Sequence, residues 1–328
     1  MYTDMSEASL VAHRSTQTEP ADFDAFWAQT LAEAARHPLA VTAIRVTDAP
    51  GAAALTTLDV YDVTFNGFGG QPIRAWLRVP AGATEPLPAI VQFHGYGRGR
   101  GQAFENLLWA SAGYAHFDMD VRGQGSGGAT GVTPDDDGGA RSGPQVPGFM
   151  TRGIESPGSY YYRRLYTDAV RAVAAARSLD LVDETRVGVM GTSQGGGIAL
   201  AVAGLVPDLA AVVARVPFLC DFPRASVITN AMPYREIAQY LAVHRLSVAT
   251  VHETLSYFDG VNFATRATTP AVFTVGLMDA ICPPSTVFGA FHRYAGPKDI
   301  TVWQYNGHEG GAWEDDALAL RAFGEHLR

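Results

Sequence analysis

A single serine surrounded by glycines, within residues 186–197, constrains the fold more than any other stretch of the sequence. This segment reads R-V-G-V-M-G-T-S-Q-G-G-G and contains the pattern G-x-S-x-G, with the serine at position 193. The residues before the serine alternate as in a short buried strand, and the apolar run from Ile198 predicts a helix. A sharp turn from strand to helix strains its middle residue, and glycines two positions either side avoid a collision. The pattern therefore predicts a serine hydroxyl at the tip of a tight turn.

The same motif also fits a glycine-rich turn that only packs a helix against a sheet, so a nucleophilic serine needs partners. Acyl transfer requires a histidine base and a carboxylate that holds the histidine in the right tautomer. In doubly wound sheets with this turn, the acid and the histidine follow the serine, each after a later strand. Asp279 follows the predicted strand 271–277, and His308 follows the predicted strand 300–305. The sequence thus predicts Ser193 as nucleophile, Asp279 as acid and His308 as base.

Other acids and histidines compete for these roles. Asp221 also follows a predicted strand, after a longer turn, and stays open as a second candidate for the acid. His94 precedes the serine and lies near the expected oxyanion loop. His116 lies inside a predicted strand, where a histidine is typically a core or paired residue.

An oxyanion formed at the serine needs backbone N–H donors. One is expected from Gln194, which follows the nucleophile at the start of the new helix. The second is expected from the loop after the strand 89–94, where Tyr96 is the best candidate and its side chain a pocket wall. Arg122 and Gln124 are interpreted as hydrogen-bonding braces of the neighbouring loop rather than as reacting groups.

Strands and helices alternate along most of the chain, which predicts a mostly parallel sheet covered on both faces. With the serine turn, this pattern predicts the α/β-hydrolase fold, in one domain of residues 1–328. Residues 1–40 form a helical extension, with an amphipathic helix over 22–36. Residues 219–269 form a helical insertion that covers the pocket mouth. The predicted strands are 60–65 and 73–79 in a hairpin, 89–94, 114–121, 210–218, 271–277 and 300–305, and further helices are expected at 103–112, 162–179 and 313–327.

Charge and cysteine content narrow the possible partners. The formal net charge is -9 and no run of Lys and Arg offsets it, which disfavours nucleic acid and anionic membranes. Cys220 and Cys282 are too few for a disulfide framework and suit a reducing compartment. Residues 1–14 contain no apolar block, so we expect no signal peptide, no membrane span and a cytoplasmic location. His308-Glu309 has no second histidine four residues on, and neither a metal nor a cofactor is expected.

Short segments spread along the chain form a family signature. They are Asp22-Phe-Asp-Ala-Phe-Trp, His94-Gly-Tyr, Arg122-Gly-Gln, Gly148-Phe-Met-Thr-Arg-Gly, Tyr160-Tyr-Tyr-Arg-Arg, Ser193-Gln-Gly-Gly-Gly, Val216-Pro-Phe-Leu-Cys, Leu255-Ser-Tyr-Phe-Asp-Gly-Val-Asn-Phe, Gly276-Leu-Met-Asp, Cys282-Pro-Pro-Ser-Thr and His308-Glu. Through these segments the chain resembles the acetyl xylan esterase and cephalosporin C deacetylase family, carbohydrate esterase family 7, along nearly its whole length.

The resemblance implies the same three triad residues, with oxyanion donors from the backbones of Tyr96 and Gln194. It implies a serine esterase that removes O-acetyl groups from acetylated xylo-oligosaccharides and small acetylated molecules such as cephalosporin C. The reaction would pass through an acetyl-enzyme intermediate, and the protein would assemble as a homo-hexamer. We expect a pocket that fits acetyl and little more, formed by Tyr96, Pro217, Phe218, Ile281 and Cys282.

Two departures from the family pattern are visible. Thr192 precedes the serine where a glycine is common, and residues 97–100 read G-R-G-R where N-G-G-R is usual. Neither change removes a catalytic group, but Arg98 near the pocket mouth bears on substrate preference. The alternatives to an acetyl esterase are a peptidase or broad carboxylesterase of the same fold, and a binding protein without activity.

Overall fold

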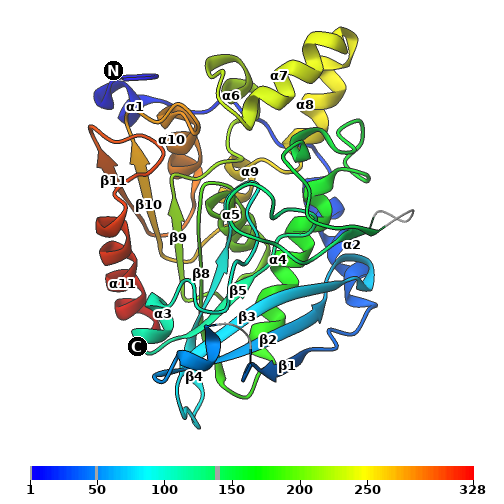
Figure 1. The fold of residues 1–328 in the computed structure, drawn as a ribbon. Helices are drawn as coiled ribbons and strands as arrows, with labels where there is room; N and C mark the ends of the chain where they lie inside the picture. Colours follow the sequence, from blue (N-terminus) through cyan, green and yellow to red (C-terminus); the bar gives the residue numbers. More distant parts are fainter. Residues whose placement is uncertain (1, 49–50, 137–140) are drawn as a thin grey trace.

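The computed structural model describes residues 2–48, 51–136 and 141–328, and in these a nine-stranded sheet runs through the molecule (Figure 1). The strand order is β1-β2-β3-β5-β4-β8-β9-β10-β11. The strands are β1 (Thr42–Arg45), β2 (Leu58–Asn66), β3 (Pro72–Pro80), β4 (Leu87–Phe93), β5 (Ala115–Met119), β8 (Val182–Thr192), β9 (Ala211–Arg215), β10 (Ala271–Gly276) and β11 (Lys298–Trp303). A separate two-stranded ribbon joins β6 (Asp135–Asp136) to β7 (Arg141–Ser142), within the long segment 126–157.

The sheet is antiparallel at one edge and parallel elsewhere. β1, β2, β3 and β5 pair antiparallel in turn, and the predicted hairpin pairs Leu58 with Pro80 through Asn66 with Pro72. From β5 through β4, β8, β9 and β10 to β11, every pair is parallel. Every residue of β9 is buried, as expected for a parallel strand covered on both faces. The predicted mostly parallel, doubly wound sheet of an α/β hydrolase is confirmed.

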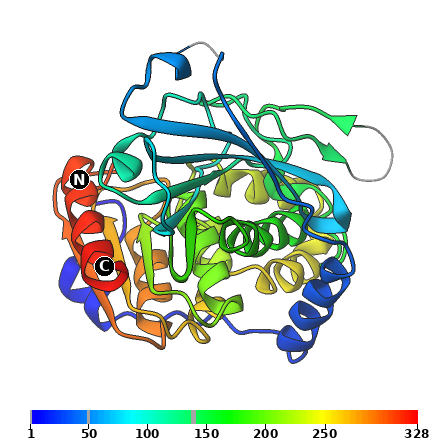
Figure 2. The same cartoon turned by 90° about the horizontal axis from the view of Figure 1, so that it is seen from below.

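Helices cover the sheet on both faces (Figure 2). On one face, Phe323 of the last helix and Trp109 pack with Ile90, Met190 and Val213 of the strands. The other face carries the larger core, which includes the helix that follows Ser193. The helices are α1 (Glu7–Ala12), α2 (Phe23–Ala35), α3 (Leu108–Ser111), α4 (Tyr161–Arg177), α5 (Gln194–Leu205), α6 (Phe222–Ile228), α7 (Tyr234–Val243), α8 (Val248–Ser256), α9 (Gly260–Ala264), α10 (Pro284–Arg293) and α11 (Trp313–Leu327).

Several helix predictions differ from the structure for physical reasons. The helix expected at 103–112 is only the short α3, and α1 and α10 were not predicted. α10 contains β-branched and aromatic residues of modest helix propensity, yet Val287 and Phe288 are buried in the large core. Tertiary packing, rather than local preference, therefore makes this segment helical.

The N-terminal extension docks on the body of the molecule through aromatic side chains. Trp27 of α2 stacks on Tyr166 of α4 and contacts the rings of Phe258 and Phe263. Its indole N–H donates to the carbonyl of Tyr257 at 2.9 Å. These contacts join α2 to the long helix α4 and to the end of the insertion.

The insertion between β9 and β10 contains α6, α7, α8 and α9. In Figure 1, α6, α7 and α8 lie at the top of the molecule, at the end toward which β9 and β10 point. The insertion is therefore placed at the carboxyl edge of the parallel strands, where ligands bind in open α/β sheets. Among the described residues, no helix is both long enough and apolar enough to cross a membrane.

Candidate active site

Ser193 lies in the tight turn between β8 and α5, with φ 59° and ψ −119°. A Cβ placed on Gly191 would lie 2.2 Å from the carbonyl carbon of Gly195, and one placed on Gly195 would lie 2.1 Å from the carbonyl oxygen of Phe93. Both approaches are far shorter than van der Waals contact, so only glycine fits at these positions. The strain at Ser193 is held in place by this close packing.

Asp279 and His308 meet at the carboxyl edge of the sheet. The Nδ1 atom of His308 lies 2.9 Å from Oδ2 of Asp279, whose side chain is fully buried. The other carboxylate oxygen accepts the backbone N–H groups of Ile281 and Cys282, at 2.8 Å and 2.9 Å. The carboxylate is thus fixed in orientation. Because it holds Nδ1 of His308, the other ring nitrogen, Nε2, is available to accept a proton.

Asp221, the second candidate for the acid, lies in the turn that begins α6. Asp221 is buried in a left-handed conformation at the start of α6, and its backbone N–H donates to Oδ1 of Asp259 at 2.8 Å. Asp259 also accepts the N–H groups of Phe222 and Val261, so it fixes the turn. The carboxylate that hydrogen-bonds His308 is therefore that of Asp279.

Ser193 and His308 both line one cavity. Within the described residues no hydrogen bond joins the serine hydroxyl to the imidazole, and the buried Cys282 follows the Asp279 carboxylate by three residues. Burial raises the pKa of the Cys282 thiol, and the charge of Asp279 adds to the effect. Contacts between nucleophile and base are often long before substrate binds, so this arrangement remains compatible with proton transfer.

Atoms of Asp279, Cys282 and His308 that could bind a metal lie within 4.8 Å of one another. The donor set fits a cation poorly, because both oxygens of Asp279 already accept hydrogen bonds. The buried Cys282 thiol, with its raised pKa, would also have to lose its proton to become a good ligand. The hydrogen bonds favour a histidine held by a carboxylate.

The two expected oxyanion donors belong to segments that two glutamines tie together. The side-chain amide of Gln194 donates to the carbonyl of His94 at 3.1 Å. Gln124 donates to Oε1 of Gln194 at 2.9 Å and accepts the N–H of Gly97 at 2.6 Å. Within the described residues the backbone N–H of Tyr96 donates to no protein group, and that of Gln194 lies in the first turn of α5. Both N–H groups are thus free to donate to an oxyanion.

Gln124 and Arg122 support the site as the sequence indicated. Gln124 bonds to the oxyanion loop, and Arg122 is fully buried and forms ion pairs with Asp168 and Asp135. Arg122 also donates to the Gln71 side chain. The interpretation of both residues as braces is confirmed.

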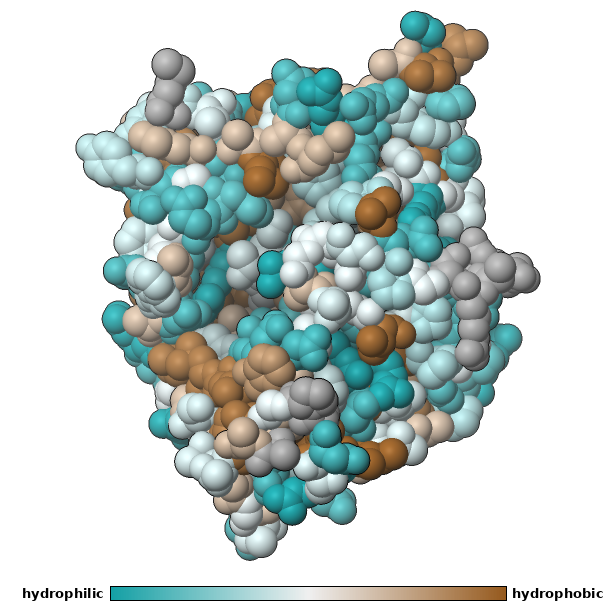
Figure 3. Space-filling model, viewed as in Figure 1, coloured by the Kyte–Doolittle hydropathy of each residue, from teal (hydrophilic) through white to brown (hydrophobic). Residues whose placement is uncertain are grey.

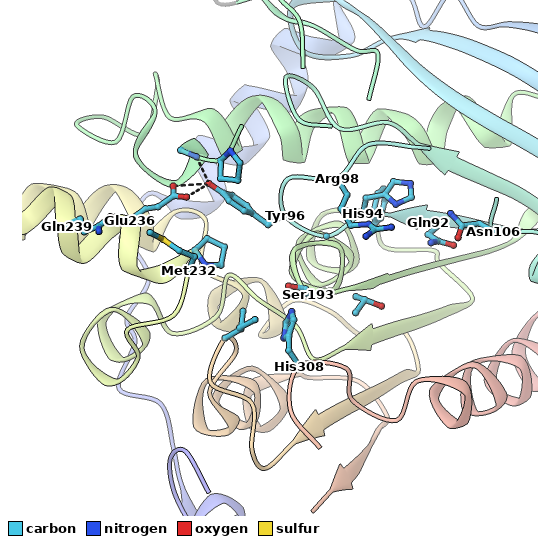
Figure 4. Close-up of a pocket in the computed structure, with 17 residues that line it drawn as sticks. Gln92, His94, Tyr96, Arg98, Asn106, Ser193, Met232, Glu236, Gln239 and His308 are labelled. Atoms are coloured by element: carbon cyan, nitrogen blue, oxygen red, sulfur yellow. Dashed lines mark hydrogen bonds between the residues drawn. The ribbon is translucent and has the colours of Figure 1, made fainter. Parts of the chain in front are cut away.

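The cavity that contains Ser193 has a volume of about 830 Å³. The face seen in Figure 3 is hollowed below the α6–α7 region, and Figure 4 shows the cavity residues in close-up. Residues of the insertion form one wall. The lining residues are Gln92, Phe93, His94, Gly95, Tyr96, Arg98, Asn106, Pro147, Gly148, Thr192, Ser193, Met232, Pro233, Glu236, Gln239, Ile281 and His308.

Of the expected pocket residues, Tyr96 and Ile281 line this cavity, whereas Pro217, Phe218 and Cys282 do not. Phe218 and Cys282 are fully buried. The segment after β9 packs under α5, since a Cβ on Gly197 would lie 2.2 Å from the carbonyl oxygen of Phe218. Phe218 therefore lies behind the serine turn, and Pro217 and Cys282 are also absent from the surface of the cavity.

Glu236 of α7 is a cavity residue that sequence reasoning missed. The phenol oxygen of Tyr96 lies 2.8 Å from each oxygen of the Glu236 carboxylate, as the dashed lines in Figure 4 show. The same phenol accepts the N–H groups of Gly148 and Phe149, and Glu236 accepts that of Met150. Burial raises the pKa of both Tyr96 and Glu236. No local pattern around Glu236 distinguishes it from other acids on an amphipathic helix.

A buried cluster of charges lies behind the cavity at His94. The Nε2 atom of His94 is 2.6 Å from Oδ1 of Asp118, and Asp118 accepts Nη1 of Arg78 at 2.8 Å. Burial alone would raise the pKa of Asp118, but His94 and Arg78 together hold it well below its usual range. His116, a core histidine as predicted, has its pKa lowered to about 3 by burial. His94 therefore faces this cluster through Nε2.

Comparison with known proteins places nearly the whole chain in one family. A family model described as acetyl xylan esterase (AXE1) matches residues 1–321. Among curated proteins, acetyl esterase Axe7A of Xylanibacter ruminicola is 29% identical over 307 residues, which cover 88% of this chain. The match spans 63% of the length of that relative.

Solved structures of the same kind superpose closely. An acetyl xylan esterase from Paenibacillus sp. R4 has a TM-score of 0.90 at 38% identity, covering 98% of this chain and 100% of its own. Acetyl xylan esterase 1 from Thermoanaerobacterium sp. JW/SL YS485 has a TM-score of 0.87 at 32% identity, covering 99% and 100%. Both likenesses cover nearly the full length of this chain.

Proposed function

Because the chain belongs to the acetyl xylan esterase (AXE1) family of carboxylic ester hydrolases, we propose that it removes acetyl groups from short acetylated xylo-oligosaccharides and small molecules such as cephalosporin C. One observation carries the proposal. Ser193 and His308 line the same cavity, and His308 is held by the buried carboxylate of Asp279 at 2.9 Å. These groups and free backbone N–H donors are what acyl transfer requires.

The proposed reaction begins with proton transfer from the Ser193 hydroxyl to Nε2 of His308. The serine oxygen attacks the acetyl carbonyl, and the backbone N–H groups of Tyr96 and Gln194 stabilise the oxyanion. The imidazolium then protonates the leaving alcohol oxygen, which leaves an acetyl ester on Ser193. His308 next takes a proton from water as the water oxygen attacks this ester, and it then returns that proton to the departing serine oxygen, which releases acetic acid and free Ser193.

The test of the nucleophile is Ser193→Ala. Turnover of p-nitrophenyl acetate should fall on the order of a millionfold, as in other triads, while thermal unfolding stays close to that of the wild type. Retained turnover in a folded variant would overturn the assignment of Ser193. A fluorophosphonate probe should label the wild type, and absence of labelling would favour a binding protein without activity.

The surroundings of Ser193 support a preference for acetyl over longer acyl groups. Cys282 is fully buried, and so is Phe218, which packs under α5 behind the serine turn. Because close packing blocks this side of the serine, we infer that the larger open part of the cavity takes the alcohol. Acetyl esters should be hydrolysed faster than butyryl esters, and equal rates would count against this. Acetate release from acetylated sugars, xylo-oligosaccharides and cephalosporin C would rank the substrates and separate this activity from that of a peptidase.

We also propose self-association into a homo-hexamer. Exposed apolar side chains at the tip of the insertion support it, since such residues often lie in interfaces. Val243 and Leu246 are 70% and 101% exposed, at the end of α7 and just after it. Light scattering gives the mass of the assembly directly, and a monomer at micromolar concentration would contradict the proposal.

A cytoplasmic location is part of the proposal and rests on cysteine chemistry. Cys220 and Cys282 are both free and buried, as suits a reducing compartment. Fractionation of source cells, with activity assayed in each fraction, tests this.

A further inference from the structure

We propose that Arg98 forms an anion subsite in the cavity, which binds a carboxylate on the alcohol part of the ester. The enzyme would then favour acetate esters of acidic alcohols, such as acetylated saccharides that carry a uronic acid. This inference rests on the proposed esterase function, because it names the substrate class of the same cavity.

Arg98 is well placed to contact the alcohol part of a substrate. It lines the cavity that also contains Ser193 and His308, and it lies two residues after Tyr96. In Figure 4, Arg98 lies near Tyr96 and His94, above Ser193. A group bound by Arg98 would therefore lie close to the ester that Ser193 attacks.

The backbone around Arg98 is held by hydrogen bonds to the neighbouring loop. The N–H of Arg98 donates to the carbonyl of Gly95 at 3.1 Å. The N–H of Gly99 donates to the carbonyl of Ala129 at 2.9 Å, and the carbonyl of Gly97 accepts the N–H of Gly127 at 2.8 Å. The base of the Arg98 side chain is thus fixed before substrate binds, which lowers the entropic cost of recognition.

The Arg98 side chain passes close to two glycines, and the approach is tight at Gly128. A Cβ on Gly128 would lie 3.0 Å from Nη1 and 3.4 Å from Cγ of Arg98, and one on Gly95 would lie 3.7 Å from its Cδ. The aliphatic part therefore passes close to the backbone of both loops. Larger residues at position 128 would displace the guanidinium.

The charge of Arg98 is available to a ligand. Within the described residues its guanidinium makes no hydrogen bond and no ion pair, and the side chain is exposed. Among the lining residues that the structure describes, Arg98 is the one lysine or arginine. The carboxylates near the cavity have other partners, since Glu236 bonds to Tyr96 and Asp279 to His308. A substrate carboxylate would meet an unpaired cation with a geometry suited to bidentate hydrogen bonds.

The volume of the cavity leaves room for such a substrate. An acetyl group fills only a small part of about 830 Å³, and Gln92, Asn106 and Gln239 add polar groups to the wall. A saccharide or another polar alcohol can therefore occupy the remainder, with its acidic substituent at Arg98.

The test compares 4-acetoxybenzoate with its neutral analogue 4-acetoxybenzamide, using kcat/KM for each in low-salt buffer. In the wild type the benzoate should be favoured. Arg98→Gln should reduce the ratio of kcat/KM for benzoate to benzamide about tenfold, through KM, as expected for loss of a charge-assisted hydrogen bond. Arg98→Lys should retain part of the preference. The matched control is Arg235→Gln, which removes an exposed charge from α7 and should leave the ratio unchanged.

Salt provides a second readout. The wild-type ratio should decrease between low salt and 1 M salt, at which the Debye length falls to about 3 Å, and the ratio of Arg98→Gln should not. The subsite would be overturned if Arg98→Gln had the same benzoate-to-benzamide ratio of kcat/KM as the wild type, or if it lowered kcat/KM equally for both esters. Either result would leave the esterase proposal intact. Failure of the wild type to hydrolyse either ester would instead overturn the proposed function, and the subsite with it.

Discussion

The phenol of Tyr96 lies 2.8 Å from both carboxylate oxygens of Glu236, a residue 140 positions away in the chain. Tyr96 follows the strand β4, whereas Glu236 belongs to α7 of the insertion. The same carboxylate accepts the N–H of Met150, and the phenol accepts those of Gly148 and Phe149. The insertion, the segment around 148–150 and the proposed oxyanion loop are therefore connected through one tyrosine and one glutamate.

Replacing Glu236 should weaken catalysis by loosening this connection. Glu236→Ala leaves the Tyr96 phenol without its acceptor, and we expect kcat for p-nitrophenyl acetate to fall about tenfold and stability by about 1–3 kcal/mol. Glu236→Gln keeps an acceptor oxygen and should lie between this variant and the wild type. Arg235→Gln, on the exposed side of the same helix, is the control. If kcat of Glu236→Ala equals that of the control, the hydrogen bond between Tyr96 and Glu236 has no part in catalysis.

Asp279→Asn should abolish most activity without unfolding the protein. The Asn oxygen can still accept the N–H groups of Ile281 and Cys282, which leaves its NH2 group facing Nδ1 of His308. The imidazole would then carry its proton on Nε2 and lose its function as a base. We expect kcat to fall about ten-thousandfold, as in other triads, with little change in melting temperature. A decrease below tenfold would exclude Asp279 as the acid.

Gly195→Ala should distort the serine turn. Its new Cβ would lie 2.1 Å from the carbonyl oxygen of Phe93, so the turn must move away from β4. We expect a loss of about 2–4 kcal/mol in the free energy of unfolding, together with loss of turnover. Gly324→Ala in α11 is the control, since its Cβ meets nothing within 4 Å and should stabilise the helix by about 0.5–1 kcal/mol. Urea unfolding of both variants measures the difference, and equal behaviour would contradict the steric argument.

Asp118→Asn should lower stability in a pH-dependent way. At pH 7 the variant leaves the buried guanidinium of Arg78 without its charged partner, at a cost of about 3–5 kcal/mol. The pKa of Asp118 is lowered in the folded state, so its contribution is complete above the unfolded-state pKa of about 3.9 and is lost as the pH falls below it. The difference in free energy of unfolding between Asp118→Asn and the wild type should therefore decrease only below about pH 4. Asp299→Asn, which changes the exposed residue of β11, is the control. An equal difference in unfolding free energy at about pH 3 and pH 7 would contradict the prediction.

The residues proposed for the reaction were predictable because each is set by local sequence. Gly191 and Gly195 mark the turn at Ser193, and the apolar strands before Asp279 and His308 indicate where those side chains emerge. The pairing of parallel strands then brings these three ends to one edge of the sheet. Alternation of strands and helices predicted the sheet for the same reason, since periodicity reflects which face of an element is buried.

Other features depend on contacts between distant segments, and no spacing in the sequence reports them. Phe218 was expected in the pocket but lies behind it, because α5 packs on the segment after β9, and Cys282 is likewise buried and does not line the cavity. The helix α10 forms because Val287 and Phe288 are buried, despite modest local propensity. What the sequence determined by itself was the serine turn, the order of the strands along the chain and the identity of the residues at their ends, all of which follow from local backbone geometry and burial period. Only the tertiary structure decided that Glu236 holds Tyr96, that Gln124 joins Gly97 to Gln194 and that Arg98 has no partner among the described residues, because such pairings depend on how separate elements pack in space.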